Sequence, residues 1–215
     1  MSGLFEKDLR LLCQNRQTLV LFLMMAGFLG LTQNGTFVLG YLSFTFSILL
    51  TSTISYDEMD QGFEFLMTLP VTPRTYVQEK YGFCTVGVIF SVVLSGIIYL
   101  VAKGIHGEQI LLGEELLTVL IFVPIVWCVI AIMVPIQLKF GAEKGRIAIF
   151  MVYGGSAFLL YFVLKCIGEG SVKLMANYLN QLKPEVLLLG GFLLSGLVLM
   201  ISYGISRRIM EKKEY

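Results

Sequence analysis

Four hydroxyl side chains recur at four-residue spacing in the second apolar stretch of the sequence: Ser43, Ser47, Thr51 and Ser55. This spacing places them along one slowly rotating face of a helix. Uncharged hydroxyls can line a pathway for an amphipathic molecule, so we predict these four residues as pathway lining. They can also bond to their own helix backbone or join neighbouring helices, and the sequence leaves both interpretations open. The apolar neighbour Leu49 is expected to face lipid.

A second candidate site is the polar segment 56–69, for which we predict a short helix. Acids stand at its start, where they complement the helix dipole, and apolar residues follow at three- and four-residue spacing. The predicted docking surface for a soluble partner consists of Asp57, Glu58, Met59, Phe63, Leu66 and Met67. The alternative, a stripe that only rests on lipid, is disfavoured because an anionic leaflet would repel the acids.

Residues suited to enzymatic or metal chemistry are scarce. The single histidine, His106, falls in a polar loop, and the four cysteines are scattered without paired metal-ligand spacing. The nearest look-alike of a phosphate-binding loop, residues 141–145, lacks both the spacing and the hydroxyl that follows the lysine. We therefore predict no catalytic residue, no metal and no cofactor bound by this chain.

The elements that position these residues are six apolar stretches without any Asp, Glu, Lys, Arg or His. They cover roughly 17–34, 35–56, 81–102, 116–138, 147–164 and 186–206. Each is near the length of about 20 residues that a helix needs to cross a bilayer. The composition agrees, with 56% hydrophobic and 14% charged residues. We predict an all-α polytopic membrane protein with six transmembrane helices, built as one domain over residues 1–215.

A short amphipathic helix is predicted before the first span, over Leu4 to Gln17. Leu4, Phe5, Leu9, Leu12 and Cys13 lie toward one side of it. Such a helix would lie in the interface plane of the membrane. Whether it has a mechanical role or is an ordinary juxtamembrane helix stays open at this point.

Basic residues are segregated by their position relative to the spans. Of the sixteen Lys and Arg residues, twelve lie near the two termini or in the segments after the second and fourth spans, and four lie in the other loops. The positive-inside rule then places both termini in the cytoplasm. The net charge of +1 reflects this segregation and indicates no nucleic-acid partner. No removable signal peptide is recognisable at the N-terminus.

Two connectors carry a family resemblance. The run 69–81, LPVTPRTYVQEKY, preceded by the acidic segment, resembles the first cytoplasmic connector of ABC type-2 transporter permeases, particularly a small six-span bacterial family that includes exporters of phenol-soluble-modulin-like peptides. The run 135–146, PIQLKFGAEKGR, is similar to that family's connector between spans four and five.

This resemblance implies a plasma-membrane permease that pairs with a second copy or a related permease and sits on cytoplasmic ATP-binding-cassette subunits. In that arrangement Leu4 to Gln17 is a connecting helix, 56–69 is a coupling helix, and ATP and Mg²⁺ are bound by the partner subunit. The expected function is ATP-driven export of hydrophobic or amphipathic peptides. The alternatives are a membrane scaffold or immunity-type protein that binds an ATPase without a pathway, and an autonomous channel, carrier or membrane enzyme.

The predicted orientation can be tested with single cysteines in a chain whose four native cysteines are replaced by serine. Cysteines at Gly107 and Ser171 should react with a membrane-impermeant maleimide in intact cells, because both positions fall in predicted external loops. Cysteines at Gly62 and Ala142 should stay unlabelled. Labelling in the reverse pattern would show that the termini are external.

Overall fold

The computed structural model describes residues 2–14, 16–32, 35–58, 72–107, 109, 111–167 and 183–212. Within 142–167 it describes the whole backbone, but side chains only at residues 147, 162 and 165. Every secondary-structure element in these ranges is a helix. The elements are α1 (Ser2–Gln14), α2 (Arg16–Thr32), α3 (Thr36–Glu58), α5 (Pro73–Ile105), α6 (Leu112–Leu120), α7 (Phe122–Ile167) and α9 (Pro184–Lys212).

Four helical segments are long and apolar enough to cross a membrane: α3, α5, the stretch Leu112–Gly141 and α9. This confirms an all-α membrane protein that crosses the bilayer several times. The number six stays a prediction. The first expected span is the shorter helix α2, of 17 residues, and most side chains of the fifth expected span, 147–164, lie outside the described residues.

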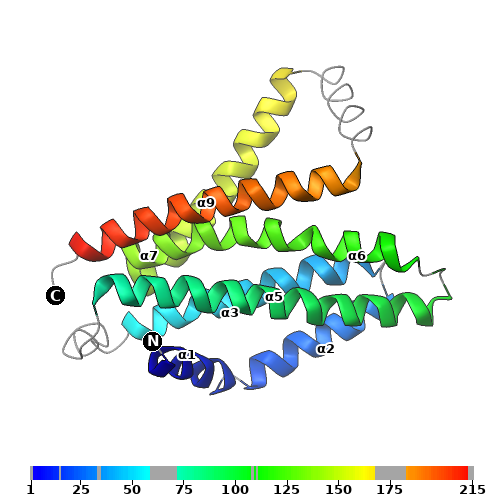
Figure 1. Cartoon of the computed structure of the whole chain (residues 1–215), viewed down its shortest axis with the longest axis horizontal. Coiled ribbons are helices and arrows are strands. Elements are labelled where there is room, and N and C mark those ends of the chain that lie inside the picture. The colour runs from blue at the N-terminus through cyan, green and yellow to red at the C-terminus, as the bar shows by residue number, and fades with distance from the viewer. Residues whose placement is uncertain are drawn as a thin grey trace.

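Helix α3 is the centre of the bundle and packs against α5 and α7, while α7 also packs along α9 (Figure 1). In the most apolar stretch of α3, 56% of the residues are buried inside the chain. In the corresponding stretch of α9, only 11% are buried. The core between these helices includes Leu50, Ile54, Val88 and Ile130. Leucines on α9 such as Leu193 are exposed, as expected for a helix whose outer face meets lipid.

Helix α1, the last turn of α3, the first turns of α5 and the last turns of α9 share one end of the bundle, which we call the α1 end (Figure 1). At the opposite end, α5 and α6 are joined by a polar contact. The Tyr99 hydroxyl donates a hydrogen bond to Glu115, and Lys103 Nζ lies 2.5 Å from the other oxygen of that carboxylate. Tyr99 therefore binds the start of the fourth span to the end of the third.

The predicted connector between spans four and five contains a sharp turn at Gly141, where two helical segments of α7 meet. The backbone of Gly141 departs from helical geometry, with φ 75° and ψ −174°, and the chain is helical on both sides of it. The later half of α7, yellow in Figure 1, turns away from the bundle after this break. A Cβ atom at Gly141 would collide with the carboxylate of Glu58, so the break lies directly against the end of α3.

Replacing Gly141 by alanine should destabilise the protein. Its φ/ψ region is essentially restricted to glycine, and occupying it with another residue costs of order 1–3 kcal/mol. The added methyl group would also push Glu58 away. We expect a lower melting temperature for Gly141→Ala in detergent.

The control is Gly82→Ala on α5, where nothing lies within 4 Å of the added Cβ atom. This variant should unfold at or above the wild-type temperature, because alanine favours a helix more than glycine does. Equal melting of the wild type and the Gly141→Ala variant would mean that the break does not depend on glycine.

Candidate functional site

The candidate site is a cluster of four charged side chains at the α1 end of the bundle, drawn from three helices. Lys7 and Asp8 come from α1, Asp57 from α3 and Lys80 from α5. Lys7 Nζ lies 2.5 Å from Asp57 Oδ1, and Lys80 Nζ lies 2.8 Å from Asp57 Oδ2. Lys80 also pairs with Asp8, and Lys7 Nζ lies 3.4 Å from Asp8 Oδ1. We call these four residues the ion network.

The ion network is almost completely removed from solvent. The side chains of Lys80 and Asp8 are 0% exposed and that of Asp57 is 4% exposed, whereas Lys7 at the rim is 32% exposed. Two ammonium groups face two carboxylates, so these four residues together are neutral, and the carboxyl group of Glu79 is buried beside them. A buried charge without a partner is very costly, and the network is therefore stable only while α1, α3 and α5 stay together.

Neutral hydroxyls complete the network. The Tyr76 hydroxyl donates a hydrogen bond of 2.8 Å to Asp57 Oδ2, and Lys80 Nζ donates one of 3.3 Å to Thr53 Oγ1. Thr53 and Asp57 stand four residues apart on α3, as do Tyr76 and Lys80 on α5. Residues at this spacing share one face of a helix, so each helix presents a matching pair to the other.

The start of α5 is fixed by its own cap. Thr72 adopts an extended conformation, its hydroxyl accepts a hydrogen bond of 3.2 Å from the Thr75 amide, and Pro73 occupies the first helical position. These are common devices for starting a helix. They set the turn on which Tyr76 and Lys80 reach the network.

Helix α1 is held by apolar contacts beside the network. Leu4 and Leu12 pack against the core, and the ring of Phe5 meets that of Phe83 on α5 edge to face at 5.2 Å. The sequence places this helix in the membrane interface. The structure adds that α1 packs onto α3 and α5 and that Asp8 is buried on its inner side.

The last helix is attached to the same region. Glu211 on α9 accepts hydrogen bonds from Arg74 at 2.8 Å and from Arg207 at 2.9 Å. Deeper in the bundle, the Tyr81 hydroxyl lies 2.5 Å from Ser202 Oγ and 2.9 Å from Ser206 Oγ. The first turns of α5 thus contact α1, α3 and α9.

The predicted docking residues divide into two groups. Met59, Phe63, Leu66 and Met67 lie outside the described residues. Asp57 and Glu58 are expected to begin the coupling helix, but the structure continues α3 to Glu58 and buries Asp57 in the ion network. An acid held there is not available on the surface for a soluble partner, although the docking role of the segment as a whole stays a prediction.

The hydroxyl stripe of α3 is turned toward the interior of this chain. Ser43, Ser47 and Thr51 are fully buried, whereas Ser55 is half-buried. Ser47 Oγ donates to the Ser43 carbonyl at 2.7 Å, and Thr51 Oγ1 donates to the Ser47 carbonyl at 3.0 Å. This geometry favours helix packing, the alternative that the sequence leaves open, and the pathway role stays a prediction.

Two further observations complete the description of the site. Leu49 does not face lipid as expected, because it is 8% exposed, and the lipid-facing neighbour is Ile48 at 44%. In the described part of the chain, no group of three His, Cys, Asp or Glu side chains lies close enough to hold a metal ion.

A comparison with known families decides the class of the protein. Residues 3–211 match the family described as ABC-2 family transporter protein. The chain belongs to this family. No protein of curated function and no solved structure matches it. Membership makes the chain a membrane transport component, the permease subunit of an ABC transporter, which associates with an ATP-binding-cassette subunit.

The family match confirms the resemblance to ABC type-2 permeases that the two connectors indicate. The more specific resemblance to peptide exporters stays a prediction. Sequence reasoning missed four residues of this site: Lys7, Asp8, Tyr76 and Lys80. A signal for Asp8 existed, since it stands next to Leu9 and four residues from Leu4 and Leu12 in the predicted amphipathic helix. Tyr76 and Lys80 carry no comparable signal, because a lysine that ends a connector is usually solvated.

Breaking the ion network from one side should strongly destabilise the permease. Asp8→Asn or Lys80→Met leaves an uncompensated buried charge, for which about 3–5 kcal/mol is typical. The double variant Asp8→Asn/Lys80→Met keeps Lys7 opposite Asp57 and stays neutral. We expect it to unfold at a higher temperature than either single variant in detergent.

The control is Arg10→Gln, which removes an exposed ion pair with Glu6 on the outer side of α1. Such pairs contribute at most about 1 kcal/mol. Single-variant effects that simply add in the double variant would show that Asp8 and Lys80 do not interact.

Proposed function

We propose that this permease exports hydrophobic or amphipathic peptides and that the ion network carries the movement of the ATPase into its membrane helices. The observation that carries this proposal is that ion pairs join α1 to both α3 and α5, the helices on either side of residues 59–71. That intervening segment belongs to the region predicted to dock on the ATPase.

The first step concerns the two flanking helices. Asp57 lies in the last turn of α3, and Tyr76 and Lys80 lie in the first turns of α5. Because Asp57 accepts from Tyr76 and pairs with Lys80, the two helix ends are clamped to each other. A force applied to the segment between them moves both ends together and does not pull them apart.

The second step concerns α1, the proposed connecting helix. Lys7 and Asp8 attach it to the same clamp, so α1 follows the ends of α3 and α5. Short ion pairs in a dry environment resist separation more strongly than apolar contacts, which can slide. The three helices therefore act as one unit at this end of the chain.

The proposed direction of transport and the proposed cargo rest on two features of the sequence. The predicted orientation places the α1 end in the cytoplasm, where an ATP-binding-cassette subunit would meet it. The predicted spans lack charged side chains, which suits an amphipathic peptide better than a small ion and gives loose selectivity. Lipids or drugs are the alternative cargo. A dimer with a second copy or a related permease, in the plasma membrane, completes the proposed assembly.

The proposed coupling predicts a separation of ATP hydrolysis from transport. Lys7→Met removes the rim member of the network and leaves the pair of Lys80 with Asp8 in place. In vesicles that contain the permease and its ATPase subunit, peptide export per ATP hydrolysed should fall about tenfold, which corresponds to about 1.4 kcal/mol. Assembly of the complex and basal ATP hydrolysis should be retained.

Arg10→Gln, one helical turn further along α1 and 79% exposed, should transport like the wild type. Normal export by the Lys7→Met variant would exclude the network from coupling. A wild-type complex that hydrolyses ATP but moves no peptide, lipid or drug would favour the scaffold or immunity-type function instead.

A further inference from the structure

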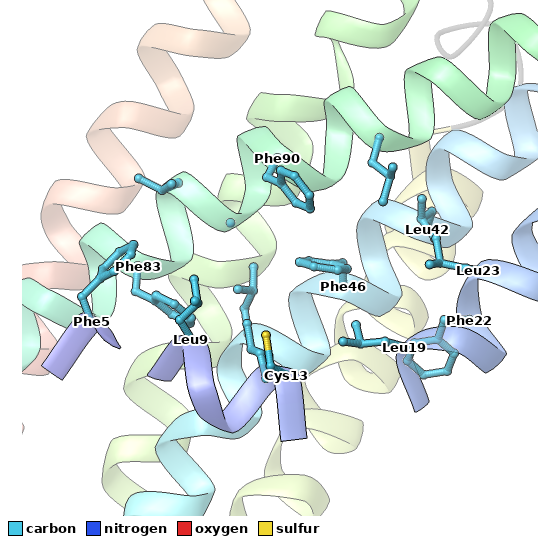
Figure 2. A pocket seen from close by; sticks show the side chains of 15 residues that line it. Phe5, Leu9, Cys13, Leu19, Phe22, Leu23, Leu42, Phe46, Phe83 and Phe90 are labelled. Atoms are coloured by element: carbon cyan, nitrogen blue, oxygen red, sulfur yellow. The ribbon is translucent and has the colours of Figure 1, made fainter. Parts of the chain in front are cut away.

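A partly enclosed apolar space lies between α1, α2, α3 and α5, separate from the ion network. Its volume is about 620 Å³. The side chains that line it in Figure 2 are all apolar, among them Phe5, Leu9 and Cys13 of α1, Leu19 and Phe22 of α2 and Phe46 of α3. We call it the α1–α2 cavity. Its size lies within the range of about 300–1,000 Å³ that is common for sites of small molecules.

The cavity is elongated along the bundle. On α5 its lining extends from Phe83 to Leu94, a rise of roughly 17 Å at about 1.5 Å per residue. One leaflet contributes half of a hydrocarbon core of about 30 Å. The cavity thus has the depth of one leaflet, beginning at the level of α1.

The cavity also opens sideways to the bilayer. Lining residues on three helices are strongly exposed: Leu9 on α1 is 49% exposed, Leu23 on α2 is 42% exposed and Val86 on α5 is 56% exposed. The ring pairs Phe5–Phe83 at 5.2 Å and Phe46–Phe90 at 6.1 Å join α1 and α3 to α5 within the lining. A long apolar molecule can therefore enter from the membrane without passing through water.

A positive charge is present where α2 begins, close in sequence to the lining of the cavity. Arg16 begins α2 and is exposed, and it lies between the lining residues Cys13 and Leu19 in the sequence. The other exposed arginine nearby, Arg10, already pairs with Glu6 at 2.6 Å. Arg16 is thus placed to meet an anionic group attached to the apolar occupant.

We propose that the α1–α2 cavity binds one acyl chain of a membrane phospholipid, with the lipid phosphate at Arg16. The depth of one leaflet, the side opening and the cation of Arg16 at the start of α2 together fit the shape and charge of this molecule. A chain bound there packs between α1 and α2 and holds α1 against α3 and α5. Binding does not require that the ion network transmit movement, so it can be tested independently of the proposed function.

The test is photo-crosslinking of the full permease in phosphatidylcholine nanodiscs that contain phosphatidylglycerol with a diazirine in its acyl chain. Mass spectrometry should find the label on cavity peptides of α1, α2 and the 83–94 part of α5 in excess over α9. Leu193 and Leu197 on α9 are 73% and 63% exposed and report ordinary lipid contact. Equal labelling of the cavity and of α9 would overturn the proposal.

Two variants of the same helix provide a matched comparison. Val86→Trp fills the cavity and should abolish the excess label on α2 peptides. Val101→Trp, whose valine is equally exposed at 56% but lies beyond the cavity, should leave that excess unchanged. Loss of label in both variants, or in neither, would contradict the assignment.

The headgroup contact has its own control. With Arg16→Gln, the excess label from phosphatidylglycerol should fall to the level given by diazirine-labelled phosphatidylcholine, whereas Arg10→Gln should keep the difference. An unchanged preference in Arg16→Gln would refute the phosphate contact. A cavity that stays unlabelled while Cys13 forms a disulfide with Cys13 of a second copy would show that a permease copy, and not lipid, covers it.

Discussion

A completely buried lysine constrains this end of the protein more than any other residue. The Lys80 ammonium has no access to water and is stable only because Asp8 and Asp57 surround it. Those two acids come from different helices, and each would be equally costly if left alone. The positions of α1, α3 and α5 are therefore set together, and the start of α5 can in turn hold α9 through Arg74 and Glu211.

The membrane architecture is predictable from sequence because it depends on composition along the chain. Apolar runs near bilayer length predict the helices α3, α5, α7 and α9, and the amphipathic run near the N-terminus predicts α1. The turn at Gly141 falls within the predicted connector between spans four and five, but the helices continue up to it on both sides, which the polar composition does not predict. Its positive φ requires glycine, and the adjacent carboxylate of Glu58, distant in sequence, adds a second constraint.

The candidate site is less predictable because tertiary contacts decide it. The four-residue spacing of Ser43, Ser47 and Thr51 fits a pathway and a packed interface equally well, and only burial separates them. Asp57 and Glu58 look like the dipole-complementing acids of a new helix, and the partners of Asp57 lie on α1 and α5. No local pattern reveals that Asp8 and Lys80, far apart in sequence, will meet.

The predicted spans contain no charged residue, yet Lys80 of the ion network lies on the spanning helix α5. The length of α5 explains how both can be true. With 33 residues this helix is roughly 50 Å long, against about 30 Å for the hydrocarbon core. Its first turns, which carry Lys80, can therefore project beyond lipid, and its far end carries Lys103 in contact with Glu115 on α6. One rigid helix thus has an ionic contact near each end. Between them it packs through apolar side chains and a few hydroxyl contacts, such as Ser95 with Ser43 on α3 at 3.3 Å. A displacement imposed at the α1 end would therefore reach the opposite end along a single helix.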